Sequence, residues 1–284
     1  MATFTNQATL SYTGGVVNSN IVTGELLEAL NVTKNALNST YTTNDRITYS
    51  VSITNSSNTA YTALTLTDDL GAYALGTGTA IPLTFEEGAL QFFVNGVLQS
   101  DPTVTVNDGL IVSGINIPAM SNALLLYSVT VNGAAPPASG NTVTNTVTLT
   151  GNEIVTPITA QETVTAEAQP RLAITKAISP AVVSPNQPLT YTFTVSNLGN
   201  TAADAADGII ITDTFDPIID ITSVTYNGIA LAEGQDYTYN QATGEFATTQ
   251  GYITVPAASF VQDPVTGEFT VVPAMGTLEI TGTV

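Results

Sequence analysis

The phrase "TVTNTVTLTG" at residues 142–151 shows how this chain is organised, because nearly the same phrase, "TFTNQATLSY", stands at residues 3–12. In both phrases apolar and polar residues alternate, which is typical of a β-strand with one buried face. The alternation places Asn145 and Asn6 on the apolar faces of these strands. An asparagine is uncommon on the buried face of a strand, and the surrounding sequence suggests a role for it.

The two phrases belong to a repeat that covers most of the chain. Residues 30–68, which begin "LNVTKNAL", and residues 172–213, which begin "LAITKAIS", share the same order of strands, turns and one lysine. The first copy continues through two further strands at 141–168, whereas the second copy reaches Val284 without them. Residues 3–29 align with those two strands. The aligned pairs are Asn6 with Asn145, Leu10 with Leu149, Ile21 with Ile158 and Glu25 with Glu162.

This arrangement predicts an all-β fold of two tandem Ig-like Greek-key β-sandwiches. The predicted parts are a donor hairpin at 1–29, a complete sandwich at 30–168 and a sandwich at 169–284 that lacks its last strands. The N-terminal hairpin resembles the missing strands, yet it leads directly into the complete domain. We therefore expect the second sandwich to be completed by the hairpin of a neighbouring subunit, that is, by strand donation.

Composition excludes several classes of function. The 284 residues include 23 acidic and 4 basic ones, and the net charge of −19 argues against binding nucleic acid or an anionic membrane. The chain has no His, Cys or Trp, which excludes disulfides, thiolate or imidazole metal sites and His-dependent nucleophilic catalysis. We expect no cofactor, no metal and no turnover enzyme, since no carboxylate pair for glycosidase chemistry is evident either.

Each copy of the repeat carries three polar residues on apolar strand faces. The chain has only two lysines, Lys34 and Lys176, and both occupy the same repeat position. An aspartate ends the same apolar strand in each copy, and an asparagine lies on a late strand. The first set is Lys34, Asp68 and Asn145, and the second is Lys176, Asp213 and Asn6 of the hairpin.

Such a set can form an amide between its own side chains. Burial lowers the pKa of a lysine and so favours the neutral amine, which is the nucleophile. A protonated aspartate, here Asp68 or Asp213, can hydrogen-bond to the asparagine carboxamide and polarise it. Attack on the carboxamide carbon then releases ammonia and leaves an isopeptide bond. Two alternatives remain open: a buried Lys–Asp ion pair beside an asparagine, and Glu162 as the acid.

Residues 172–215 resemble the conserved repeat of bacterial and archaeal surface proteins called domain of unknown function eleven. They are also similar to the fimbrial isopeptide-forming domains of Gram-positive bacteria, and the resemblance extends over 30–284. In the fimbrial relatives a first-strand lysine, an aspartate after a hydrophobic strand and a late-strand asparagine form the bond. The resemblance implies that these roles fall to Lys34, Asp68 and Asn145, and to Lys176, Asp213 and Asn6.

Together these features predict a structural subunit of an extracellular, pilus-like fibre whose partner is another copy of itself. Head-to-tail donation propagates an open fibre, in which Asn6 of one subunit meets Lys176 and Asp213 of the next. The alternative is a monomeric or wall-associated adhesin with intramolecular bonds only and an unknown host ligand. The sequence shows no secretory signal at its start and no apolar stretch that predicts membrane insertion, so we expect a cell or spore surface without an evident export route.

Overall fold

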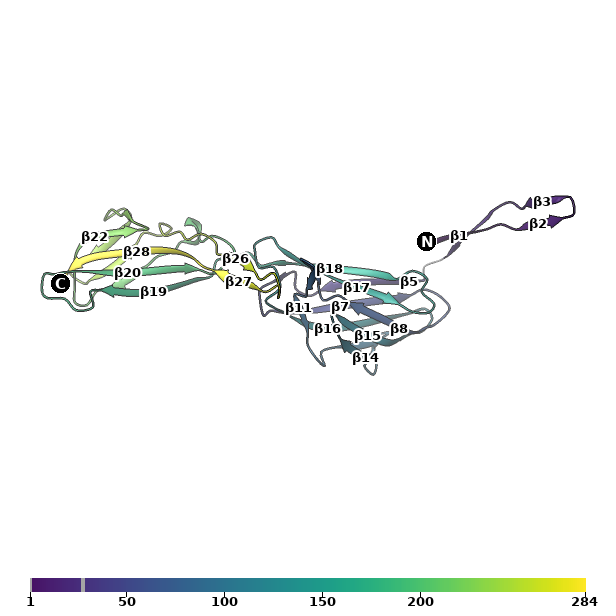
Figure 1. Cartoon of the computed structure of the whole chain (residues 1–284). Helices are drawn as coiled ribbons and strands as arrows, with labels where there is room; N and C mark the ends of the chain where they lie inside the picture. The colour runs from purple at the N-terminus through teal and green to yellow at the C-terminus, as the bar shows by residue number, and fades with distance from the viewer. Residues whose placement is uncertain (1, 27–28) are drawn as a thin grey trace.

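The computed structural model of the chain describes residues 2–26 and 29–284. Within these ranges the regular structure is β-strand apart from one 3₁₀ turn, η1 (Ala205–Asp207). The strands form an N-terminal hairpin and two sandwiches that follow one another along an elongated molecule (Figure 1). The prediction of an all-β fold with two tandem sandwiches is confirmed.

The first sandwich, domain one, packs two six-stranded sheets around a shared hydrophobic cluster. The first sheet has the order β13-β12-β16-β7-β5, with β11 attached to β16, and the second has the order β14-β15-β8-β17-β18-β6. The first sheet consists of β13 (Val97–Leu98), β12 (Gln91–Val94), β16 (Ser121–Val131), β7 (Arg46–Asn55), β5 (Leu30–Ala36) and β11 (Leu83–Phe85). The second consists of β14 (Thr103–Val106), β15 (Leu110–Ile117), β8 (Tyr61–Asp68), β17 (Thr142–Thr150), β18 (Ile158–Ala166) and β6 (Thr40–Tyr41). A short hairpin, β9 (Tyr73–Leu75) with β10 (Gly78–Ala80), follows β8.

Alternation along the strands explains the core of domain one. In β7 the inward positions Ile47, Tyr49, Val51 and Ile53 are fully buried, and the positions between them are half-buried or exposed. The burial of these apolar side chains between two sheets is the main favourable contribution to folding. The inward faces of β8 and β17 follow the same pattern, so the second sheet closes over the first.

The second sandwich, domain two, has one full sheet and one short one. The five-stranded sheet has the order β19-β20-β28-β22-β23, and the three-stranded sheet has the order β21-β25-β24. The long sheet consists of β19 (Leu172–Ser179), β20 (Pro188–Asn197), β28 (Ala274–Thr283), β22 (Asp220–Tyr226) and β23 (Ile229–Ala230). The short sheet consists of β21 (Thr212–Thr214), β25 (Glu245–Thr248) and β24 (Tyr237–Asn240). β21 lies at the edge of its sheet, whereas β8 in domain one pairs with β17 on that side, so the part of the chain described here supplies no counterpart of β17 and β18 to domain two.

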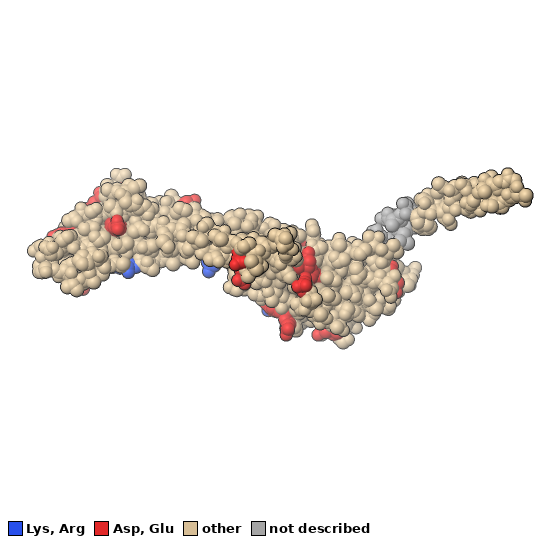
Figure 2. Space-filling view, in the orientation of Figure 1, with Lys and Arg blue, Asp and Glu red and all other residues tan. Residues whose placement is uncertain are grey.

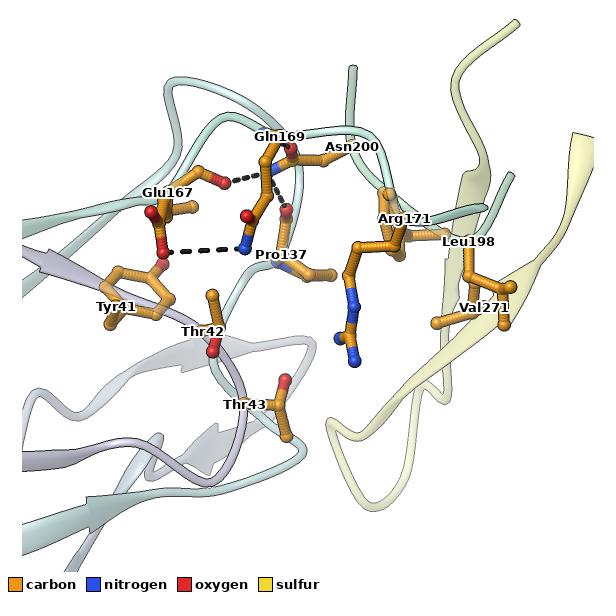
Figure 3. A pocket seen from close by; sticks show the side chains of 13 residues that line it. Tyr41, Thr42, Thr43, Pro137, Glu167, Gln169, Arg171, Leu198, Asn200 and Val271 are labelled. Carbon is orange, nitrogen blue, oxygen red and sulfur yellow. Dashed lines mark hydrogen bonds between the residues drawn. The ribbon is translucent and has the colours of Figure 1, made fainter. Parts of the chain in front are cut away.

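The two domains meet through polar contacts and a second hairpin, β26 (Ser259–Gln262) with β27 (Phe269–Val272). The Asn200 side chain donates to the carbonyl oxygens of Pro137 and Glu167 at 2.8 Å, and Gln262 donates to the Tyr73 hydroxyl at 2.6 Å. A small pocket lies at this junction, with Tyr41 and Pro137 on one side and Arg171 and Val271 on the other (Figure 3). Gln169 donates to the Glu167 carboxylate at 3.5 Å in its wall, and residues of both domains line the pocket, so it is part of the domain contact.

The N-terminal hairpin pairs with itself and projects from the end of domain one that lies away from domain two (Figure 1). It consists of β1 (Ala2–Asn6), β2 (Thr9–Tyr12), β3 (Gly15–Asn18) and β4 (Val22–Leu26). The prediction of one continuous strand over 3–12 is wrong, because the strand is interrupted at Gln7 and Ala8. There the Gln7 side chain donates to the Ser19 carbonyl and the Ser19 hydroxyl accepts from the Ala8 amide, so side chains replace two ladder bonds.

The register of the hairpin also differs from the alignment. In domain one Asn145 pairs with Glu162, and the alignment made Glu25 the counterpart of Glu162. In the hairpin, however, Asn6 pairs with Val22 and Glu25 pairs with Thr3. Register is strongly specified only where one face of a strand is buried, and this ribbon lies free of the two sandwiches. The structure of the free chain therefore does not reproduce the predicted pairing of the two strands, and the equivalence of Asn6 with Asn145 stays a prediction.

Candidate functional site

Three residues predicted from the sequence lie in the core of domain one. Lys34 comes from β5 in one sheet, and Asp68 and Asn145 come from the neighbouring strands β8 and β17 in the other. The Lys34 Nζ atom donates to Asp68 Oδ2 at 2.7 Å, and the two side chains are 0% and 1% exposed. Asn145 is fully buried, and it shares a face of β17 with Val147, the residue that pairs with Asp68.

Two tyrosines complete the surroundings of Lys34. The Nζ atom lies 4.7 Å from the centre of the Tyr49 ring and 5.9 Å from that of Tyr127. The Tyr127 hydroxyl donates to the Asp68 carboxylate, whose other oxygen accepts from the Leu70 amide at 2.8 Å. Removal from water lowers the pKa of Lys34 even though Asp68 acts in the opposite direction. Burial therefore makes the neutral, nucleophilic form of the amine more populated than it is in a surface lysine.

Asn145 is chemically unusual because its carboxamide has no hydrogen-bond partner. Neither Oδ1 nor Nδ2 is bonded, and the Tyr49 hydroxyl in the same core is also without a partner. Leaving such a group buried and unpaired costs about 1–3 kcal/mol. A neutral carboxamide enclosed with an amine and a carboxyl group has the parts of an amide-exchange reaction, and this set requires no other reagent.

Glu162 takes a secondary place in this geometry. It pairs with Asn145 across β17 and β18 and is half-buried, and it acts on the pKa of Lys34 more weakly than Asp68 does. Asp68, in contrast, bonds to Lys34 directly and is fully buried. The geometry therefore favours Asp68 as the acid, and this assignment stays a prediction.

In domain two the equivalent lysine is open to solvent. Lys176 bonds to Asp213, but their side chains are 41% and 17% exposed. The Lys176 Nζ atom lies 4.6 Å from the centre of the Tyr191 ring, nearly the same distance as between Lys34 and Tyr49. Asn6 lies on the projecting hairpin, so the single chain brings Lys176 and Asp213 together but not Asn6 (Figure 1).

The first strand of each domain shows what covers one site and not the other. In β5, Leu30 and Val32 are each 6% exposed, whereas the equivalent Leu172 and Ile174 of β19 are 42% and 55% exposed. β18 packs against β5 in domain one, and β19 has no such neighbour among the described strands. The apolar inner face of β19 is thus left uncovered around Lys176.

The hairpin carries a matching apolar surface. Its exposed large apolar side chains are Phe4, Leu10, Tyr12, Val16, Val17, Ile21 and Val22. No charged residue occurs between residues 2 and 24, and the part of the hairpin that Figure 2 colours is tan, whereas acidic side chains are scattered over the two domains. A lone two-stranded hairpin is marginally stable in water, so this surface favours a partner.

Sequence reasoning missed the tyrosines around Lys34. A signal for Tyr49 existed, because "RITYSV" and "PLTYTF" place Tyr49 and Tyr191 at the same point of the repeat. Tyr127 had no such signal. In domain one it pairs with Tyr49, whereas Tyr191 pairs with Ile280, so the repeat does not preserve the second tyrosine.

Comparisons with solved structures identify distant likenesses. The chain matches the pilus backbone protein of Streptococcus pneumoniae at 14% identity and a TM-score of 0.36, over 86% of this chain and 55% of that one. A variant of the major pilin subunit of Bacillus cereus matches at 10% identity and a TM-score of 0.40, over 95% and 73%. A collagen-binding adhesin domain of Staphylococcus aureus matches at 15% identity and a TM-score of 0.31, over 50% and 99%. Neither family models nor curated proteins gave a match.

Within 2–26 and 29–284 no cluster of three or more His, Cys, Asp or Glu side chains could hold a metal ion. No helix in those ranges has the length and apolarity that crossing a membrane requires.

The buried tyrosines of domain one predict a loss of stability in alkali. Burial raises the pKa of Tyr41 to about 12, and burial, with a contribution from Asp68, also raises the pKa of Tyr49 and of Tyr127. A raised pKa means that the folded state resists deprotonation, so this stability is complete below about pH 10 and is lost as the pH rises towards the folded values. We expect the urea midpoint of unfolding to fall above about pH 10 and to fall less in Tyr49→Phe. An unchanged midpoint up to about pH 12 would contradict this prediction.

Proposed function

We propose that the protein is a structural subunit that polymerises head to tail into an extracellular, pilus-like fibre on a cell or spore surface. It belongs, on this proposal, with the isopeptide-forming surface domains that its sequence resembles. The observation that carries the proposal is the contrast between β5, which is buried, and β19, whose equivalent apolar face is exposed. The hairpin that would cover β19 is present but projects from the far end of the same chain (Figure 1).

The proposed junction copies the completed sandwich of domain one. The hairpin of one subunit enters domain two of the next, where β1 pairs with the free edge of β21 as β17 pairs with β8. Backbone hydrogen bonds then supply affinity, and alternate side chains supply specificity. Because donor and acceptor surfaces differ and lie at opposite ends of the chain, the contact repeats without closing.

The junction is also proposed to become covalent. The lone pair of Lys176 Nζ attacks Cγ of the incoming Asn6, the Cγ–Nδ2 bond breaks, and a lysine proton passes through Asp213 to the leaving nitrogen. The products are one amide and one ammonia, so atoms and electrons balance without a cofactor. Lys34, Asp68 and Asn145 carry out the same reaction within domain one. Each site reacts once, so the protein is not a turnover enzyme.

Assembly is predicted to depend on the apolar face of the hairpin. Phe4→Asp places a charge on the face that would enter domain two, and burying an unpaired carboxylate is strongly unfavourable. We expect the variant to remain monomeric at concentrations where the unmodified chain forms fibres visible by electron microscopy. Light scattering should show the same difference in solution.

The matched control for this variant is Thr5→Asp. It adds the same charge to the same strand but at the alternate position, which faces away from the sandwich in the proposed junction. Fibres should form from Thr5→Asp and not from Phe4→Asp. Equal assembly of both variants would overturn strand donation and favour a monomeric surface adhesin.

A further inference from the structure

The core of domain one leaves three polar atoms unpaired, and they belong to two residues, Tyr49 and Asn145. Both residues are fully buried, so no solvent reaches them. The Asn145 carboxamide is close enough to lower the pKa of Tyr49 against the rise that burial causes. The Tyr49 phenol and the Asn145 carboxamide therefore lie near each other without a hydrogen bond between them. This suggests that the hydrogen bond forms at another stage, while Asn145 reacts.

The same tyrosine recurs in domain two. Tyr49 and Tyr191 occupy the same position of the repeated strand, and each ring lies beside the lysine of its site, at 4.7 Å and 4.6 Å from Nζ. Other aromatic neighbours differ: Lys34 lies near Tyr127, whereas Lys176 lies near Phe193 and Phe215. The tyrosine hydroxyl that both sites share is therefore that of Tyr49 and Tyr191.

We propose that Tyr49, and Tyr191 in the junction site, donates a hydrogen bond to the asparagine carboxamide oxygen as the lysine attacks. This inference rests on the proposed amide reaction and names a residue in it that the sequence resemblance does not. Negative charge develops on Oδ1 when Nζ bonds to Cγ, and a donor already fixed beside that oxygen stabilises the charge. In the product the same hydroxyl donates to the new amide carbonyl.

Tyr49 is suited to this role by its surroundings. Burial raises its pKa, so the hydroxyl keeps its proton beside the amine. Its ring packs on that of Tyr127 with centroids 5.8 Å apart, which holds the hydroxyl in place. The Tyr49 hydroxyl has no other hydrogen-bond partner, so it can donate to the Asn145 carboxamide when Oδ1 turns towards it.

Tyr127 hydrogen-bonds to the acid of the site and not to the carboxamide. Its hydroxyl donates to Asp68, the proposed proton carrier, and does not need to contact the carboxamide. It is a positioning residue for the acid, and domain two has no tyrosine in its place. Because Tyr49, and not Tyr127, is proposed to bond to the carboxamide, loss of the Tyr49 hydroxyl should slow the attack on Asn145 itself.

The test measures ammonia loss from freshly made protein. Full-length chain carrying Asn6→Ala, in which only the domain one site can react, is synthesised in a cell-free system, and samples are stopped in denaturant at intervals. Intact mass then gives the fraction that has lost one ammonia. We expect Tyr49→Phe in this background to slow the loss by about 10²-fold, the scale of removing one oxyanion donor.

Tyr61→Phe is the control, because Tyr61 is half-buried against the same core at the opposite end of β8 from Asp68. It should react at the parent rate. Tyr49→Phe removes an unpaired hydroxyl and should fold as well as the parent, so circular dichroism separates slow chemistry from misfolding. A parent rate in folded Tyr49→Phe overturns the role of the tyrosine alone. A parent that keeps its full mass overturns both the tyrosine's role and the amide itself.

Discussion

Fibres of the unmodified chain, boiled in SDS, should run on a gel as a ladder of covalent multimers, whereas fibres of Lys176→Ala should run as monomer. Strand donation alone is non-covalent, and boiling detergent separates it. An amide between Asn6 and Lys176 survives that treatment. The expected effect is therefore the complete loss of the ladder from a single substitution at a residue that is 41% exposed in the free subunit.

Three further variants make the gel specific. Lys176→Arg keeps a cation next to Asp213 but has no neutral amine to attack, because arginine stays protonated, so it should also lose the ladder while still forming fibres. Asn6→Ala should behave in the same way. Lys34→Arg alters only the site in domain one and should keep the ladder. A single monomer band from visible fibres of the unmodified chain would contradict the covalent junction and leave strand donation intact.

Asn145→Ala should lower the free energy of unfolding of domain one by about 4 to 5 kcal/mol, because it removes a cross-link that closes a loop of roughly 100 residues. The substitution leaves the Lys34–Asp68 pair in place, so it does not strand a buried charge. Chemical denaturation followed by circular dichroism measures the loss. Intact mass should show the unmodified chain one ammonia lighter than its sequence and the variant unchanged.

The sign of the Asn145→Ala effect separates the amide from the alternative of a buried ion pair. If no bond forms, the substitution removes two unpaired buried polar atoms, and stability should stay the same or rise. An unchanged or increased free energy of unfolding, together with the full sequence mass in the unmodified chain, would therefore contradict the bond. Lys34→Ala is less informative, because it leaves Asp68 buried without its partner and costs about 3–5 kcal/mol in either case.

Much of this site could be predicted from the sequence because the lysine and aspartate of the site occur in both copies of the repeat. Alternation placed Lys34 and Asp68 on inward faces, and the structure bonds them to each other. Recurrence in the second copy distinguished the polar residues of the site from polar residues that fall on an apolar face by chance. Lys176 and Asp213 pair as Lys34 and Asp68 do. The hairpin was predicted less well. Its first strand is interrupted at Gln7 and Ala8, and its register differs from that of β17 and β18.

Periodicity and order, which are properties of neighbouring residues, were enough to predict most of the strands and the repeat from the sequence, and the origin of the N-terminal hairpin as two displaced strands stays a prediction. The surroundings of each lysine, in contrast, depend on the folded molecule. Lys34 is enclosed by a facing sheet and by tyrosines from β7 and β16, whereas Lys176, in a nearly identical local sequence, remains partly in water. Burial and pKa differ between such sites because they depend on which strands lie across the core. A strand's own sequence does not contain that information.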